Sequence, residues 1–236
     1  MKINVPTSWE AVSLRQYQAI TALFKEAEEK AVNIKNKTKE LHDYHTECAL
    51  ISTLTGEDMD EILALNRAAH NHIMNALGFI SEPITGKVKT RTRINKNRYY
   101  FEKNARNING GQWVTIMHFL EDEDKIDGNL HNLLACFAYR VKMGWFKEKI
   151  KATKDEYGDE VFTYNGKRHE HIAKDMLDLP MTTVKPLTDF FLKDWLKSVR
   201  NMSVYLEIEG KRVKRKAERQ LARSKADTDG STQLTD

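Results

Sequence analysis

Turn-forming residues and cysteines are scarce in this chain. Its 236 residues include only 11 glycines and 4 prolines, which excludes collagen-like and low-complexity classes and disfavours a turn-rich all-β sandwich. Two cysteines are too few to suggest a disulfide framework. Cys48 and Cys136 each lie within an apolar helical pattern, so we expect buried small hydrophobic side chains. This cysteine usage fits synthesis in a reducing, cytoplasmic compartment.

Long apolar runs are also missing. No stretch approaches the roughly 18 apolar residues that a membrane span needs, so we expect no membrane partner. Residues 1–6 lack the apolar core of a secretory signal, and we expect none. With 40% hydrophobic and 31% charged residues, the chain is expected to fold around a core rather than stay disordered.

Sequence motifs for catalysis and for cofactor or metal binding are missing as well. There is no Walker glycine–lysine loop, no Gly-x-Gly-x-x-Gly fingerprint and no Gly-x-Ser-x-Gly elbow. His42, His45 and Cys48 follow one helical row, which we interpret as two boundary histidines beside a core cysteine. The acidic run over 121–129 has Asp127 where a calcium loop requires glycine. We therefore predict a non-enzymatic protein without metal or cofactor.

Positive charge is concentrated in two segments. Residues 87–106 hold eight Lys or Arg and one Glu, and residues 211–225 hold the same numbers, so each segment has a formal charge of +7. Subtracting both segments from the chain's +4 leaves −10 for all other residues. An acidic body with two basic segments can bind phosphate groups or the acidic body of a neighbouring copy.

Helical periodicity dominates the first third of the sequence. A capping box over 13–16 opens an apolar stripe that predicts a helix over 14–31. A second helix is predicted over 38–54, with Gly56 as its C-terminal stop. Two shorter helical patterns follow, and residues 1–83 are therefore predicted to form a helical bundle.

The pattern changes to a period of two in residues 84–108. Basic residues alternate there with β-branched ones, which predicts an extended strand with one basic face and a partner strand over 98–101. The basic residues of this strand are Lys87, Lys89, Arg91 and Arg93. Such a strand can contact phosphate groups, can block edge-to-edge aggregation, or can pair with an acidic neighbour in an oligomer.

The C-terminal basic segment leaves similar alternatives open. Its candidate contact residues, for a subunit interface or for phosphate, are Arg212, Lys214 and Arg215. Neither basic segment has a base-reading motif, so any contact with DNA would be non-specific. Residues 209–236 are predicted to form a basic segment followed by a disordered tail.

Helical spacing returns in residues 109–208, which are predicted to form a second helical part with one β-hairpin over 146–167. The helices are predicted over 113–120, 130–141, 168–179 and 183–202, the last with Pro186 in its first turn. The expected fold class is therefore α+β and predominantly α-helical, with an N-terminal bundle, a central basic β element and this second helical part.

Several short motifs resemble those of late virion-morphogenesis proteins from tailed phages of Bacteroidetes, the crAss-like phages among them. The segments similar to these proteins are residues 2–10, 14–17, 51–57, 61–65, 111–113, 129–135 and 190–191. The motif around Leu54-Thr55-Gly56 is also similar to a helix–turn–helix step in tail assembly chaperones. The resemblance spans most of residues 1–200.

This resemblance implies a non-enzymatic structural protein of the virion, made in the cytoplasm of the bacterial host. It implies a homo-oligomeric ring or connector subunit of the neck and tail, with copies of itself and other virion proteins as partners. The alternatives are a cargo protein and a tail assembly chaperone that is absent from the mature virion. The charge pattern adds a third alternative, a protein that binds nucleic acid without sequence specificity.

Overall fold

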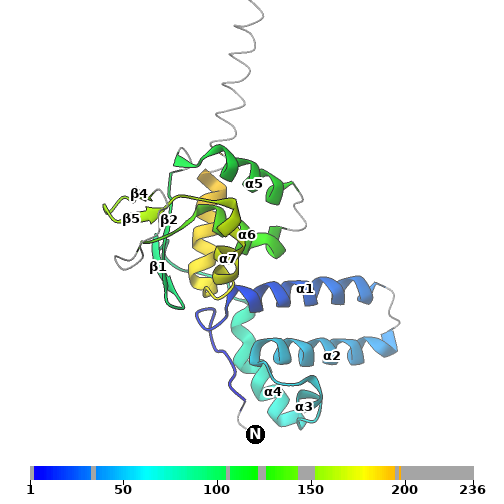
Figure 1. The fold of residues 1–236 in the computed structure, drawn as a ribbon. Coiled ribbons are helices and arrows are strands. Elements are labelled where there is room, and N and C mark those ends of the chain that lie inside the picture. The colour runs from blue at the N-terminus through cyan, green and yellow to red at the C-terminus, as the bar shows by residue number, and fades with distance from the viewer. Residues whose placement is uncertain are drawn as a thin grey trace, which may run out of the picture. The chain divides into compact units, whose positions relative to one another are not determined.

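The computed structural model describes residues 3–32, 36–104, 107–121, 126–142, 152–194 and 197. Its helices and strands give an α+β fold in which helix predominates, as the sequence predicts (Figure 1). Residues 1–191 make up one compact unit. The basic C-terminal residues Arg212, Lys214 and Arg215 lie outside the described residues, as do residues 122–125 of the acidic run over 121–129.

The N-terminal helices follow the predicted pattern. They are α1 (Leu14–Ala31), α2 (Asn36–Thr55), α3 (Met59–Leu63), α4 (Arg67–Ala76) and the 3₁₀ helix η1 (Leu77–Ser81). The predicted capping box is confirmed, because the Ser13 hydroxyl accepts from the Gln16 N–H and the Gln16 side chain accepts from the Ser13 N–H. α2 ends before Gly56, whose φ of 76° is a left-handed value that favours glycine.

Three strands form an antiparallel sheet in the order β1-β2-β3. β1 (Arg91–Ile94) and β2 (Asn97–Phe101) form a hairpin, and β3 (Ala138–Arg140) pairs with β2. The predicted basic strand is therefore shorter than expected. The Phe101 N–H donates to the carbonyl of Thr90 (2.8 Å), and β2 ends there. No strand of the described residues pairs with Lys87 or Lys89, and these residues precede β1 in a segment without regular structure.

The most apolar helix also ends earlier than predicted. α5 (Gly110–Leu120) and α6 (Ile126–Phe137) correspond to the helices predicted from residues 113 and 130. Val141 lies outside α6, although its spacing continues the apolar stripe. Residues 138–140 instead form β3, and the Val141 N–H donates to the carbonyl of Arg98 (2.9 Å). Pairing with a distant strand thus overrides a local helical pattern.

The second hairpin is confirmed within its predicted range. β4 (Ala152–Lys154) and β5 (Glu160–Phe162) pair across a turn, while residues 143–151 lie outside the described part of the chain. α7 (Gly166–Met176) follows, and residues 181–194 are helical. Since this last helix begins at Met181 rather than at 183, Pro186 lies in its second turn and not in its first, contrary to the prediction.

Two sets of contacts join the N-terminal helices to the rest of the compact unit. The Leu14 N–H donates to the carbonyl of Leu179 (2.8 Å), and the Met181 N–H donates to the carbonyl of Val12 (2.9 Å). Gln18 adds a side-chain contact, because its Nε2 donates to a backbone carbonyl at the start of α6 (2.8 Å). Segments about 165 residues apart in sequence are therefore neighbours in the fold.

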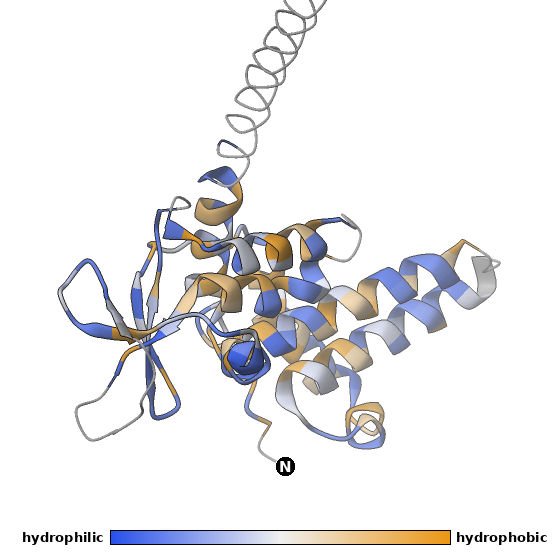
Figure 2. Cartoon of the chain, turned by 45° about the horizontal axis from the view of Figure 1, so that its top comes forward, coloured by the Kyte–Doolittle hydropathy of each residue, from blue (hydrophilic) through white to orange (hydrophobic). Residues whose placement is uncertain are grey.

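Burial follows the helical stripes. Fully buried apolar side chains include Leu14 and Ile51 in the N-terminal helices and Leu134, Met176 and Leu187 in the remainder. Figure 2 shows alternating hydrophilic and apolar faces on the long helices. Cys48 and Cys136 are buried and free of disulfides, as predicted. Among the described residues, no helix combines the length and the apolar character that crossing a membrane requires.

Candidate functional site

The β1–β2 hairpin and the segment before it have charged side chains of one sign only. From residue 83 to residue 101 the chain has no Asp or Glu. The six basic residues in this stretch, which we call the basic hairpin, are Lys87, Lys89, Arg91, Arg93, Lys96 and Arg98. All six are exposed. The structure thus exposes the four predicted residues and two more, Lys96 and Arg98, and it places Arg91, Arg93 and Arg98 around one hollow.

Arg91 is the member of this surface with a contact inside the fold. Its guanidinium forms ion pairs with Asp155 and, at 2.8 Å, with Asp159. It also lies 4.1 Å from the centre of the Tyr157 ring. Through these contacts, Arg91 links the turn between β4 and β5 to β1.

The surroundings of Asp155 favour the charged carboxylate that pairs with Arg91. Its carboxylate is fully buried and accepts hydrogen bonds from the backbone N–H groups of Tyr157 and Asp159, both at 2.9 Å. Burial opposes ionisation of this carboxyl, but the hydrogen bonds from Arg91 and from the two N–H groups outweigh it. The pKa of Asp155 therefore lies below its ordinary value.

Two arginines of the basic hairpin face each other directly. Arg93 on β1 is the ladder partner of Arg98 on β2, so both side chains lie on one face of the sheet. The inner part of this face is covered, because Val161 of β5 packs against Tyr100 and Tyr139. The outer part, with the two arginines, stays open beside a hollow of about 310 Å³.

Like charges directly opposite each other destabilise a hairpin. Within the described part of the chain, neither Arg93 nor Arg98 has a carboxylate partner, since the nearby Asp159 pairs with Arg91. The arrangement thus leaves unneutralised positive charge on an exposed face. An anionic partner from outside the described chain would relieve this repulsion.

A surface of opposite sign lies on α2 and α3. Residues 40–66 contain seven Asp or Glu and no Lys or Arg. Residues 57–61, which run from the end of α2 into the first turn of α3 and which we call the acidic turn, hold four of the seven carboxylates. Asp58 is the N-cap of α3 and accepts from the Asp60 N–H (2.8 Å), which fixes a negative charge at the positive end of that helix. The charge total of the sequence indicates an acidic body but not this concentration, which the absence of basic residues between Lys39 and Arg67 indicates.

No protein-family model matches this chain. No curated protein and no solved structure shows significant similarity to it either. The two charged surfaces and the short motifs are therefore the features that point to its function.

The residues behind that resemblance make structural contacts. Gln16 Nε2 donates to the carbonyl of Leu54 (2.9 Å), so the α1 motif meets the α2–α3 step. Trp9 packs edge-on against Tyr17 and Phe79. Gln112, fully buried, joins α5 to the end of α6 and to β3. These motifs fix the positions of helices.

The histidine row has a local role in the same bundle. His42 Nε2 lies 3.1 Å from the carbonyl of Ala27, and Cys48 is buried in the core. Among the described residues, no group of three or more His, Cys, Asp or Glu side chains is placed to hold a metal ion.

Proposed function

We propose that this protein is a non-enzymatic structural subunit of a tailed-phage virion, a ring or connector component of the neck or tail. It binds further copies of itself by placing the basic hairpin of one copy against the acidic turn of the next. The observation that supports this proposal most is the exposed Arg93–Arg98 pair, which lacks a carboxylate partner among the described residues.

The two complementary surfaces lie on different elements, β1–β2 and α2–α3. A contact between unlike surfaces is heterologous, and repeated contacts of this kind close into a ring or continue as a filament. Charge complementarity provides orientation and specificity more than raw affinity. The phage context comes from the motif resemblance, and a ring or connector subunit is the role in that context that uses both surfaces.

The experiment measures the molar mass of the full chain by light scattering at low salt. The variant R93Q/R98Q removes the unneutralised pair and leaves Arg91 in place, and it is expected to shift the protein from oligomer to monomer. The control K25Q/K39Q removes two exposed charges from α1 and α2 and is expected to keep the oligomer. A monomeric wild-type chain, or equal behaviour of both variants, would contradict the proposal.

Two alternatives use the same surface or the same context. A tail assembly chaperone would be present in infected cells and absent from purified virions, which quantitative mass spectrometry of both samples tests. A non-specific nucleic-acid-binding protein is favoured by the six basic residues without an acid. Its affinity for duplex DNA would fall steeply with salt, and R93Q/R98Q would reduce that slope by about two contacts.

A further inference from the structure

Gln18 on α1 joins the N-terminal helices to α6 through one side-chain amide. Its Nε2 donates to the carbonyls of Asp127 and Gly128, both at 2.8 Å, at the start of α6. The same nitrogen lies 3.1 Å from Nδ1 of His131, about one turn further along that helix. An amide nitrogen can only donate, so His131 Nδ1 accepts, and the ring is neutral with its proton on Nε2. This contact between α1 and α6 therefore requires an uncharged His131.

His169 on α7 is a second histidine in the same region. Its ring stacks on Phe119 of α5, with the ring centres 5.8 Å apart, and its Nδ1 lies 3.2 Å from the Tyr164 hydroxyl. Its Nε2 is buried, and within the described part of the chain it has no hydrogen-bond partner. A protonated ring has an N–H on both nitrogens, and a buried charged donor without a partner is costly. The surroundings of His169 therefore favour the neutral ring.

Both histidines have a pKa lowered from the ordinary value of 6.5. Burial is the largest cause for each of them, because it penalises the charged ring. For His131, the positive charges of protonated His169 and of Arg15 lower the pKa further. Protonation of one histidine therefore opposes protonation of the other.

The groups around the pair do little to stabilise a positive charge. The charged or titratable ones are Arg15 of α1, His118 of α5, Asp127 and Cys136 of α6, and Tyr164 before α7. Asp127 lies one turn before His131 but is exposed, so solvent screens its attraction. Burial raises the pKa of Cys136 and of Tyr164, so both stay neutral. His118 is exposed and lies 3.7 Å from Glu121.

We propose that His131 and His169 form an acid-sensitive joint between the N-terminal helices and the rest of the compact unit. In mild acid both rings take up protons, His131 Nδ1 becomes a donor that faces the Gln18 amide, and α1 separates from the start of α6. The backbone hydrogen bonds that join residues 12–14 to residues 179–181 involve no titrating group, so they remain as the hinge. The joint lies within one chain, so it works with or without the proposed assembly.

The direction of the pH effect follows from the lowered pKa values. With the joint open, both histidines titrate near their ordinary 6.5, whereas the closed form binds their protons only at lower pH. As the pH falls below 6.5, the open form therefore binds more protons and gains population. The joint is fully closed above that pH and is lost as the pH falls through the lower, folded-state pKa values.

Hydrogen exchange of the full chain, followed by mass spectrometry from pH 7.5 to about pH 4.5, measures this opening. Protection factors are compared, since they correct for the chemical pH dependence of exchange. In residues 14–20 of α1 and 126–134 of α6, wild-type protection is expected to fall at least about tenfold in acid, as for the loss of one hydrogen bond.

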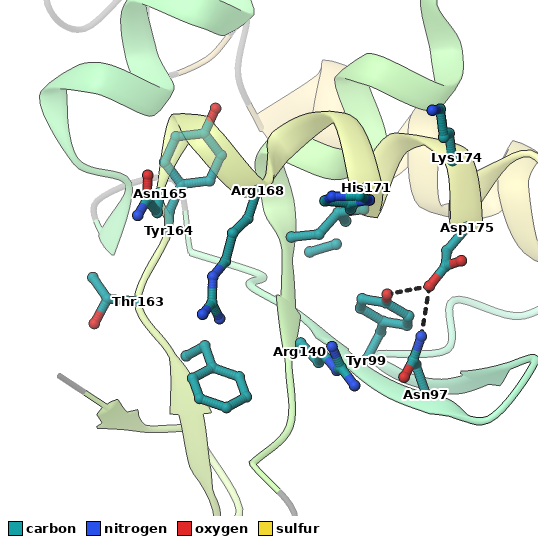
Figure 3. A pocket seen from close by; sticks show the side chains of 13 residues that line it. Asn97, Tyr99, Arg140, Thr163, Tyr164, Asn165, Arg168, His171, Lys174 and Asp175 are labelled. Carbon is teal, nitrogen blue, oxygen red and sulfur yellow. Dashed lines mark hydrogen bonds between the residues drawn. The ribbon is translucent and has the colours of Figure 1, made fainter. Parts of the chain in front are cut away.

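Two variants separate the histidine pair from other titrating groups. H131N keeps an acceptor for Gln18 and H169F keeps a ring stacked on Phe119, so H131N/H169F is expected to change its protection less than about twofold over the same pH range. H171Q is the matched control on α7. His171 is exposed and lies two residues from His169, on the opposite side of the helix, where it lines a cleft beside the sheet (Figure 3). H171Q is expected to respond to acid as wild type does.

Q18E provides a second test if the double variant folds poorly. A carboxylate at position 18 attracts protonated His131, so the loss of protection in acid is expected to be smaller than in wild type. The proposal is wrong if wild-type protection does not change with pH, or if H131N/H169F or Q18E loses as much protection as wild type. It is also wrong if H171Q suppresses the loss.

Discussion

Gln112 uses both ends of its side-chain amide in a fully buried position at the start of α5. Its Nε2 donates to the Cys136 carbonyl (2.6 Å) and to the Tyr139 hydroxyl (2.9 Å), while its Oε1 accepts from the Asn109 N–H (3.0 Å). One side chain thus completes the capping box of α5 and joins α5 to the turn from α6 into β3. A buried polar group of this kind stabilises the fold only because its hydrogen bonds are made.

Replacing Gln112 by leucine leaves the Tyr139 hydroxyl and two backbone groups without this partner. We expect Gln112→Leu to lower the free energy of unfolding by about 1–3 kcal/mol, measured by urea denaturation. Val114→Ala serves as the control on the same helix, since Val114 is 68% exposed and its truncation is expected to change stability by less than about 0.5 kcal/mol. A Q112L variant as stable as wild type would show that these hydrogen bonds contribute nothing.

The buried carboxylate of Asp155 gives the fold a dependence on pH. Its pKa is lowered from the ordinary 3.8, so its contribution to stability is complete above that value and is lost as the pH falls through the lower, folded-state pKa. Asp155→Asn is therefore expected to be less stable than wild type at pH 7, and this difference is expected to shrink as the pH falls below about 4. Urea denaturation of both proteins from pH 7 to pH 3 measures it. Asp43→Asn, an exposed aspartate on α2, is the control, and a D155N difference that does not change with pH would contradict the ion-pair account.

At the scale of helices and strands, the sequence predicts those elements whose start, end and buried face depend on neighbouring residues. α1 has its capping box and its apolar stripe within 18 residues, and α2 has a glycine at its end, so both were predictable. β3 was not, because its strand character comes from β2, about 40 residues away. The anchor of Arg91 likewise lies 64 residues away at Asp155, and nothing in the alternating pattern distinguishes Arg91 from Arg93.

The same limit applies to the candidate sites. Alternation in residues 87–93 predicted the basic face but not the Arg93–Arg98 pair, which depends on the register of the hairpin. Arg140 of β3 and Arg168 of α7 line the same cleft, and no spacing in the sequence indicates this. The sequence therefore predicts how many charged residues each segment has, whereas only the folded structure shows which of these charges lie next to each other.

Gly86 controls how the segment before β1 lies on the last helix. A Cβ at this position would lie 2.0 Å from the Thr182 carbonyl oxygen and 3.1 Å from Pro186 Cγ. In a regular helix the Thr182 carbonyl would accept a hydrogen bond from the N–H of residue 186, but proline has no N–H. The segment around Gly86 can therefore approach this carbonyl closely. Gly86→Ala is expected to destabilise the fold by about 1–3 kcal/mol in urea denaturation, since backbone must move.

Gly78→Ala is the matched control for this prediction. An added Cβ at Gly78 meets no atom within 4 Å, and the residue does not have a positive φ. We expect this variant to be at least as stable as wild type, because alanine reduces the entropy of the unfolded chain. If G86A matches G78A in stability, Gly86 does not lie against the last helix as closely as described.

At the scale of the whole molecule, the basic hairpin and the acidic turn have opposite charges and lie on different elements of one compact unit. Assembly through exposed charges is screened by salt, with a Debye length of about 8 Å at physiological ionic strength. The oligomer is therefore expected to dissociate as sodium chloride is raised toward 1 M, while circular dichroism shows that each subunit stays folded. An oligomer that persists unchanged at that salt concentration would point to an apolar interface instead.

The most direct test of head-to-tail assembly is light scattering on two charge-reversed variants, alone and mixed. K89E/R93E/K96E/R98E changes the formal charge of the basic hairpin from +6 to −2, and D58K/D60K/E61K makes the acidic turn basic. Each variant alone is expected to be monomeric, because its two surfaces then have the same sign. An equimolar mixture is expected to assemble again, with the two variants alternating, since every contact joins opposite charges. A mixture that stays monomeric, while both variants are folded, would contradict pairing between the basic hairpin and the acidic turn.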